Sequence, residues 1–480
     1  MRIRNAASTT RVMVVAVMVS MVAFLDSTVV NLALPSTARD LGGGMALQQW
    51  VVGGYLLALG AMILPGGSIS DRFGRLPVLR LGLVAFGAGS AVAATAPSAA
   101  VLITARVVQG LGAAFLVPGS LAMISAVFGS DRLSAAIGTW TAWTGTAFAL
   151  GPLLGGLAVD ILSWRWIYAL SAIPMVIGFG LTYWMCPMPK PTYHSRIDIA
   201  GGGLSAAGIA ATVYALVESQ RRTWSDPRVG GAFLIGAVAL IGFARWQRRA
   251  RYPMLPLRLF SNRNFAAGNV ATALVYGGLA LGSLVIALYT QEALGYSATA
   301  AGLATLPIPI LSFLFARDVG DASTRFGPRI FLIVGPVIAG IGLWLIRPAP
   351  YDFDIVTDLI LGMLLFATGL VLTVTPLTSI SISTTDPGDA GIASAVNNAI
   401  SKLAGLITIA CMGLIAAGTL SDTSFLRLIR VSAGLFILGA MVCAAMITNP
   451  TTPLGPVPCD VAASCRDRVG AQPVLASSEV

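Results

Sequence analysis

The stretch GGSISDRFGR, residues 66–75, joins two long apolar runs, and an echo of it, GDASTRFGPR, occupies residues 320–329. Membrane transporters are often built from duplicated halves, so that an internal echo of this kind marks equivalent points of two repeats. The echo therefore indicates two related halves, and two six-helix bundles would place this loop at equivalent points, between the second and third helix of each.

The composition outside these loops is that of a membrane protein. Of 480 residues, 56% are hydrophobic and only 10% are charged, against about 25% charged in soluble domains. The 53 glycines and 26 prolines are tolerated in membrane helices, where neighbouring helices satisfy the backbone. The net charge of +10 lies in short loops rather than on one face of a domain, which argues against a nucleic-acid partner. We expect an all-α integral membrane protein.

Apolar runs long enough to cross a bilayer recur along the whole chain. A spanning helix needs about 20 mostly apolar residues, and this length identifies about fourteen candidates. They cover residues 12–35, 47–66, 77–96, 99–128, 133–159, 164–186, 199–217, 229–246, 265–290, 298–316, 330–346, 355–382, 392–420 and 428–447.

The echo and the spans together predict four parts of the chain. Residues 1–187 would form an N-terminal six-helix bundle and residues 265–448 a C-terminal one. Residues 188–264 would hold two extra central spans and a basic loop. Residues 449–480, rich in Pro, Thr and small side chains, would be a disordered cytoplasmic tail.

The basic residues predict the orientation. About 20 of the 30 Lys and Arg fall in the N terminus, the tail and the loops on their side, against about 8 in the opposite loops, and the richer side is normally cytoplasmic. We expect a multi-pass protein of a bacterial plasma membrane with both termini in the cytoplasm. Anionic lipid headgroups are the expected contacts of the basic loop.

Five short motifs occur in order in the first third of the chain. They are LDSTVVNLALP (residues 25–35), GSISDRFGR (67–75), RVVQGLGAA (106–114), GPLLGG (151–156) and WRW (164–166). Together they resemble the fourteen-span drug:proton antiporter branch of the major facilitator superfamily. The resemblance implies two six-helix bundles plus two extra central helices, export of drugs by alternating access, and a functional monomer.

Asp26 is the only acid that falls well inside an apolar run, where an ionised carboxylate is costly and functional by default. From the helix rise, Asp26 lies about 13 Å and Arg106 about 10 Å from the outer ends of their spans. If the two helices face one another, as the resemblance implies, the two groups can pair. We expect Asp26 to carry the proton and Arg106 to tune it; a static ion pair is the alternative.

Two further motifs predict moving parts. The loop at 67–75 would form a cytoplasmic latch between the bundles, in which Gly67 and Gly74 permit close approach and a tight turn. The charge-assisted bonds of the latch would come from Asp71, Arg72, Arg75 and, in the next loop, Asp131. The echo has Thr324 in place of Asp71, so the latch would be asymmetric. The small-residue spacing of the other motif permits close helix packing around a proline bend, and its members are Gly151, Pro152, Gly155 and Gly156.

Aromatic and polar residues at helical spacing are candidates for a cavity that takes a lipophilic substrate, although such residues more often serve packing. They are Asn31, Tyr55, Gln109, Phe115, Trp140, Trp143, Asn397 and Lys402. The side chain of Lys402 either points into the bundle or snorkels to the membrane surface. The sequence leaves both readings open.

The chain has no Walker phosphate loop, no His/Glu zinc motif and a single histidine, His194. We therefore expect no enzyme activity, no metal and no cofactor, with the proton gradient as the energy source. The predicted function is a proton-coupled exporter of drugs or other small amphipathic compounds. The alternatives are a dedicated exporter of one endogenous metabolite, antibiotic, lipid or siderophore, and a membrane sensor that transports nothing.

Overall fold

The computed structural model describes residues 2–127, 139–140, 143, 151–183, 198–219, 222, 224–251, 253, 255, 257–347, 359–383, 390–416 and 421–449. Every regular element among these residues is a helix. The helices of the N-terminal part are α1 (Arg2–Leu41), α2 (Gly44–Phe73), α3 (Arg75–Ala94), α4 (Ala99–Val127), η1 (Ala158–Leu162), α6 (Trp164–Tyr183), α7 (Ile199–Glu218) and α8 (Pro227–Arg249). Those that follow are η2 (Leu257–Ser261), α9 (Arg263–Glu292), α10 (Ala298–Thr305), α11 (Pro307–Phe326), α12 (Pro328–Leu345), α13 (Leu361–Ser383), α14 (Ala390–Ala416) and α15 (Asp422–Met446).

Twelve helical stretches of the described chain are long and apolar enough to cross a membrane, with α10 and α11 forming one of them. The count is thirteen when the two arms of α1, Thr10–Ala23 and Thr28–Leu41, form one bent span. The expected span at 133–159 lies largely outside the described residues, and its end is a shorter apolar helix, Gly151–Leu162. The total of fourteen stays a prediction, as do the domain boundaries and the tail at 449–480.

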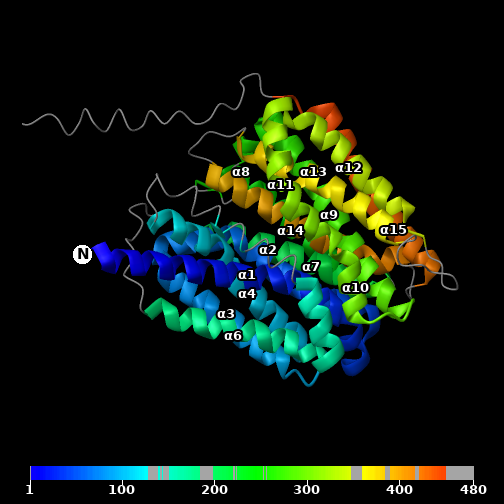
Figure 1. Ribbon diagram of the computed structural model, residues 1–480, viewed down its shortest axis with the longest axis horizontal. Coiled ribbons are helices and arrows are strands. Elements are labelled where there is room, and N and C mark those ends of the chain that lie inside the picture. The colour runs from blue at the N-terminus through cyan, green and yellow to red at the C-terminus, as the bar shows by residue number, and fades with distance from the viewer. Residues whose placement is uncertain are drawn as a thin grey trace, which may run out of the picture.

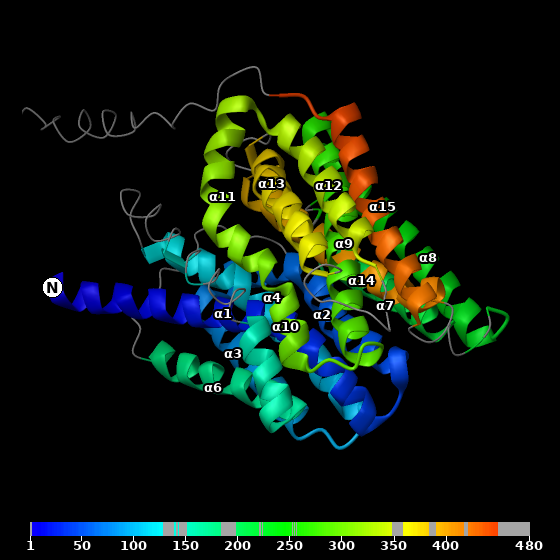
Figure 2. The ribbon, with the colours of Figure 1, turned by 45° about the vertical axis from the view of Figure 1, so that its right-hand side comes forward.

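The helices form two sets. One contains α1, α2, α3, α4 and α6, and the other contains α9 to α15 (Figure 1). We call the end of the molecule at which α1 begins the proximal face and the end at which α1 finishes the distal face. The two sets spread apart toward the proximal face and approach each other around α10 (Figure 2).

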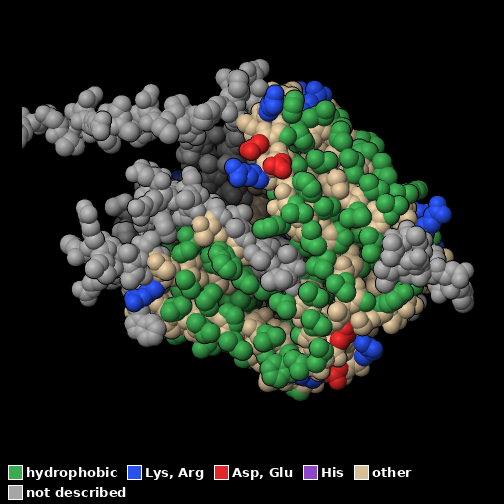
Figure 3. All heavy atoms as spheres, in the orientation of Figure 1, with side chains coloured by type: hydrophobic (Ala, Val, Ile, Leu, Met, Phe, Trp, Pro, Cys, Tyr) green, Lys and Arg blue, Asp and Glu red, His purple; other side chains and the backbone are tan. Residues whose placement is uncertain are grey.

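The surface of the molecule is suited to lipid. On the described part of the visible face, hydrophobic side chains are widespread and most charged side chains lie near the edges (Figure 3). The α8 helix is the most peripheral span, with 11% of its apolar window buried inside the protein. Its partner α7 packs against α2 of one set and α14 of the other. The α7–α8 hairpin therefore lies at the side of the boundary between the sets.

The repeated loop has the same backbone in both copies. The α2 helix ends at Phe73 and α3 begins after Gly74, whose φ and ψ are 95° and 144°. The α11 helix ends at Phe326 and α12 begins after Gly327, with φ 85° and ψ 144°. A positive φ of this size is strained for any residue with a Cβ, which explains the glycine in both copies. The sequence echo is thus also a structural one.

Candidate functional site

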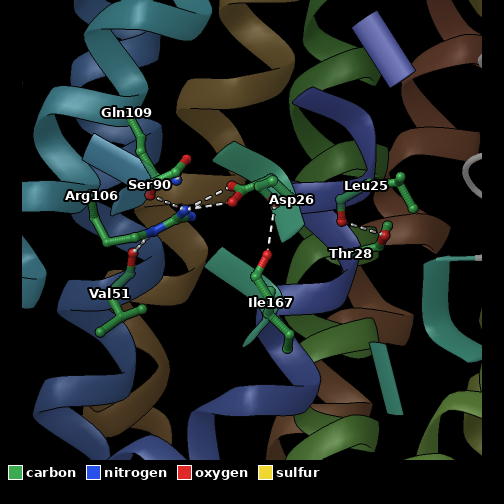
Figure 4. Close-up of polar contacts among 9 residues, drawn as sticks. Leu25, Asp26, Thr28, Val51, Ser90, Arg106, Gln109 and Ile167 are labelled. Atoms are coloured by element: carbon green, nitrogen blue, oxygen red, sulfur yellow. Dashed lines mark hydrogen bonds and ion pairs between the residues drawn. The ribbon is translucent and has the colours of Figure 1, made fainter. Parts of the chain in front are cut away.

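The side chains of Asp26 and Arg106 meet in the interior of the first set of helices. The Arg106 Nη1 atom donates to both carboxylate oxygens of Asp26, at 2.9 Å and 2.7 Å (Figure 4). Each residue is only 1% exposed. Among the described residues they are the only acidic and the only basic residue in the buried class. The structure therefore brings together the two ionisable residues that the sequence analysis paired.

The guanidinium of Arg106 is fixed by further contacts. Its Nε donates to the Val51 carbonyl at 3.0 Å, and Nη1 also donates to Gln109 Oε1 at 2.9 Å. Gln109 Nε2 in turn donates to Ser90 Oγ at 2.7 Å. These bonds orient the Arg106 side chain independently of Asp26. Loss of the carboxylate charge would therefore leave the guanidinium with other acceptors.

Two aromatic rings complete the surroundings of the ion pair. The Cζ atom of Arg106 lies 4.5 Å from the ring centroid of Tyr55 and 5.7 Å from that of Tyr168. Both distances fall within the range of cation–π attraction. Tyr168 was missed by the sequence analysis, although it follows the WRW motif by two residues.

Close helix contacts explain why Arg106 can reach α2. A Cβ atom added to Gly110 would lie 2.3 Å from the Tyr55 carbonyl oxygen on α2, and one added to Gly112 would lie 2.6 Å from the Phe86 N on α3. The glycines of the RVVQGLGAA motif thus let α4 lie directly against two neighbours. On α1, Asp26 lies within the 41° bend between the arm that ends at Ala23 and the arm that begins at Thr28.

The electrostatics of the pair follow from its burial. Charges at about 3 Å attract strongly where water is excluded, but removing both from water costs several kcal/mol per ion. A neutral Asp26 would lose this attraction. The ion pair therefore holds α1 against α4.

The GPLLGG segment forms the second part of the site, at the distal side. A Cβ added to Gly156 would lie 2.6 Å from the Thr299 Cα, and one added to Gly302 would lie 2.3 Å from the Pro152 carbonyl oxygen. The backbone of this segment thus lies against α10 of the other set. Gly155 and Gly151 instead face α1, where added Cβ atoms would lie 2.3 Å from Val29 Cγ1 and 2.9 Å from Thr28 Oγ1.

Polar contacts reinforce this distal seam, which we define as the contacts of the 151–162 helix with α10 and of α2 with α9 and α14. The Asp160 carboxylate accepts from the backbone N–H groups of Ala298 and Thr299, at 3.0 Å and 2.7 Å. A carboxylate at a helix N-terminus is favourable. Elsewhere in the seam Gln48 donates to Glu292, and Gln49 donates to the Ile409 carbonyl at 2.8 Å. Asp160 was not among the residues that the sequence singled out, although it follows the GPLLGG motif closely.

The WRW motif has a local role at the same face. Trp164 Nε1 donates to Asp40 Oδ2 at 3.0 Å, and the Arg165 guanidinium forms an ion pair with the same carboxylate. Asp40 lies near the end of α1. The motif therefore joins the distal ends of α1 and α6.

The expected latch is only partly described. Gly67 and Asp71 lie in α2, but the Asp71 side chain and the whole of Asp131 lie outside what the structure describes. Arg72 is exposed, with its Cζ 5.6 Å from the Phe73 ring centroid. Gly74 forms the turn and Arg75 begins α3.

The expected cavity residues occupy different environments. Tyr55 and Gln109 belong to the ion-pair site, and Phe115 packs near Gly66 and Gly82 of α2 and α3. Trp140 donates to Ser20 Oγ at 3.1 Å, whereas Trp143 is 56% exposed.

The remaining candidates lie on α1 and α14. Asn397 donates to Thr272 Oγ1 at 2.8 Å and Asn269 Oδ1 at 3.3 Å, both on α9. Asn31 and Lys402 are half-buried. Within the described residues no group of three His, Cys, Asp or Glu side chains could hold a metal ion.

The sequence profile of the Major Facilitator Superfamily matches residues 16–409, most of the chain. The chain belongs to this superfamily, and it is a multi-span membrane transporter of that fold.

Curated relatives are similar along most of their length. The puromycin resistance protein of Streptomyces alboniger is 32% identical over 415 residues, covering 85% of this chain and 81% of the relative. The tetracenomycin C resistance and export protein of Streptomyces glaucescens is 29% identical, with 85% and 76% covered. The multidrug resistance protein Stp of Mycobacterium tuberculosis is 30% identical, with 83% and 74% covered.

Solved structures show the same fold at low identity. A POT family transporter in complex with a thioalcohol-conjugated peptide superposes with a TM-score of 0.70 at 17% identity, covering 90% of this chain and 95% of that one. A D-xylose–proton symporter superposes with a TM-score of 0.66 at 15% identity, covering 92% and 98%.

Proposed function

We propose that this transporter is an antiporter that exports small amphipathic compounds, drugs among them, in exchange for protons. The observation that carries the proposal is the buried Asp26–Arg106 pair, in which the only buried acid of the described chain is held by a guanidinium with alternative acceptors. An ionisable group inside the membrane marks a functional site by default, and proton relays are one of the roles that such acids serve. The resistance and export proteins among the relatives support the cargo class.

The proposed cycle uses the two parts of the site in turn. Protonation of Asp26 removes its attraction for Arg106, and the guanidinium keeps its bonds to Val51 and Gln109. The contact between α1 and α4 is then weaker. Since α1 also packs against the 151–162 helix and α10, this change reaches the distal seam, where the two sets of helices meet. Opening of the seam and closure of the proximal side would expose the cargo to the other side of the membrane.

The proposal includes an orientation. In this orientation the proximal face is cytoplasmic, and both termini lie on that side of a bacterial plasma membrane. Arg72, Gly74 and Arg75, together with their echo at 320–329, then lie at the cytoplasmic face. The protein works as a monomer without a cofactor, metal or catalytic activity. The latch of Asp71, Arg72, Arg75 and Asp131 would form when the proximal face closes.

The test is transport by the purified protein in proteoliposomes. A panel of chemically unrelated amphipathic compounds is offered under an imposed pH gradient, with and without a proton uncoupler, and internal pH is followed at the same time. We expect uncoupler-sensitive movement of several compounds with opposite proton movement. Transport of the panel that the uncoupler leaves unchanged would refute proton coupling.

The same experiment separates the alternatives. A dedicated exporter would move one compound of the panel or none, and would respond only to its own cargo. A membrane sensor would bind a compound without any proton flux. Proton flux that accompanies several unrelated compounds is expected of the multidrug antiporter alone.

A further inference from the structure

Lys402 lies at mid-depth in α14 and is not used by the proposed proton cycle. It is 12 residues from Ala390 and 14 from Ala416, the ends of the helix, which places it about 18 Å and 21 Å from them. The side chain is half-buried. A lysine at this depth is costly unless it faces protein or a water-filled path.

The helix faces of α14 show which way the side chain points. The exposed apolar residues Ile407 (46%) and Leu414 (40%) mark the outward face. At 100° per residue, Lys402 lies about 120–140° around the helix from both of them. Its position is instead within about 40° of Asn398, Leu406 and Ile409.

The same face of α14 lies on the boundary between the two sets of helices. A Cβ on Gly60 of α2 would lie 2.9 Å from Leu403 Cδ2, and one on Gly53 would lie 3.5 Å from Leu406 Cδ1. The carbonyl of Ile409 accepts from Gln49 of α2. Lys402 therefore lies beside the α2–α14 crossing and away from the lipid side, which favours the interior reading over snorkelling.

The described charged residues do not balance this lysine. In the part of the chain that the structure describes, the ion pairs involve Asp26, Asp40, Glu218 and Asp226, and none of them includes Lys402. Asp26 is already paired with Arg106. When both members of that pair are charged, Lys402 adds one positive charge at mid-depth that no acidic side chain of the described residues neutralises.

We infer that Lys402 is the substrate-binding cation of this transporter and that it selects amphipathic compounds carrying one acidic group, such as a sulfonate, carboxylate or ionised phenol. The bound anion neutralises the ammonium and its apolar body lies among the helices of the boundary. This inference rests on the proposed export function and names the cargo class. Proton coupling at Asp26 and anion recognition at Lys402 are then served by separate charges.

The experiment compares two fluorescent ligands that share one apolar scaffold. 8-Anilinonaphthalene-1-sulfonate carries the acidic group, and N-phenyl-1-naphthylamine lacks it. Binding of each is titrated to the purified full-length protein in phosphatidylcholine nanodiscs, with empty nanodiscs subtracted. Lys402→Met is expected to weaken sulfonate binding about tenfold or more, the usual range for loss of one charge-assisted contact. Binding of the neutral analogue should stay within about twofold.

Two further variants make the result specific. Lys402→Arg keeps the charge and should retain sulfonate binding. Arg427→Met removes one exposed positive charge from α15 and should change neither ligand. Equal weakening of both ligands by Lys402→Met, or no change in sulfonate binding, would overturn the inference.

A titration in a second lipid distinguishes a bound substrate from a lipid headgroup as the partner of the Lys402 ammonium. Repeating the titration with phosphatidylglycerol in the nanodisc should leave the Lys402-dependent binding in place. Its disappearance there would assign the ammonium to anionic lipid and refute the substrate role. Because binding is read without a proton gradient, the outcome is independent of proton coupling. Uncoupler-insensitive transport would defeat the proposed antiport while leaving this result standing.

Discussion

The two sets of helices differ in whether their interior basic residue is paired with an acidic one. In the first set, Arg106 lies within hydrogen-bonding distance of Asp26, Gln109 and the Val51 carbonyl, so that its charge is fully matched by the protein. In the second set, Lys402 has no ion-pair partner among the described residues. The comparison indicates that the two halves of a duplicated fold can serve different functions. In the proposed mechanism, one repeat holds a charge pair whose balance changes with protonation, and the other presents a charge that the cargo balances.

The largest effect is expected when the buried ion pair of the first set of helices is broken. Asp26→Asn leaves Arg106 buried without its counter-charge, and removal of one partner of a buried pair costs about 3–5 kcal/mol. We expect a clear fall in thermal stability and loss of uncoupler-sensitive efflux in proteoliposomes. The double variant Asp26→Asn/Arg106→Gln should recover stability without recovering transport.

A matched control exists at the distal face. Asp40→Asn makes the same substitution in an exposed pair with Arg165, and surface pairs contribute little to stability. It should change neither the melting temperature nor efflux appreciably. Undiminished proton-driven efflux by Asp26→Asn would break the assignment of coupling to the first set of helices.

The next effect concerns the contact through which the two sets meet. Gly302→Ala places a Cβ 2.3 Å from the Pro152 carbonyl oxygen, and overpacking of this kind costs about 1–3 kcal/mol. The distal-closed arrangement should therefore become less populated. Spin labels on cysteines at Phe73 and Phe326, both exposed, should report a shorter distance across the proximal face.

Gly180→Ala is the matched control, because a Cβ there meets nothing within 4 Å. Its label distances should equal those of the parent. If Gly302→Ala leaves the distance distribution unchanged as well, the distal seam does not hold the two sets in this arrangement.

A smaller effect is expected at the carboxylate that caps α10. Asp160→Ala removes the acceptor for the Ala298 and Thr299 N–H groups, and loss of such a cap costs about 0.5–2 kcal/mol. Amide hydrogen exchange in α10 should become faster, while Asp160→Asn, which keeps an acceptor, should exchange at nearly the parental rate. Equal exchange in all three proteins would show that the cap does not stabilise the seam.

The smallest effect lies outside the two sets, at the start of α8. Hydrogen bonds from the Arg228 N–H and the Arg222 guanidinium hold the pKa of Asp226 below its usual range. A lowered folded-state pKa contributes stability above the unfolded pKa, and this contribution is lost as pH falls through the folded value. Asp226→Ala should lower the melting temperature slightly and equally from about pH 5 to 8. The difference should shrink as the pH falls below the usual aspartate range and through the lowered folded-state pKa, and efflux near neutral pH should be unchanged.

Much of the site could be predicted from the sequence because a charged group in hydrocarbon is energetically costly. A carboxylate within an apolar run, as at Asp26, is too costly to be incidental, and the helix rise placed Arg106 at a similar depth. Asp160 and Tyr168 were missed because nothing in a single sequence says which helix lies opposite them. The pairing of Asp160 with α10 joins residues about 140 positions apart, and only the packed chain brings them together.

The sequence by itself determined that the chain lies in a membrane, where its apolar runs lie, and that its loop at 66–75 has a partner at 320–329. These properties follow from composition and local spacing, which need no knowledge of neighbours. Only the tertiary structure decided that Arg106 has acceptors besides Asp26, that the GPLLGG segment packs on α10, and that Lys402 faces the boundary between the sets. The direction of a side chain on a helix that is apolar all round is set by the helices against which it packs, and no periodicity in the chain records that choice.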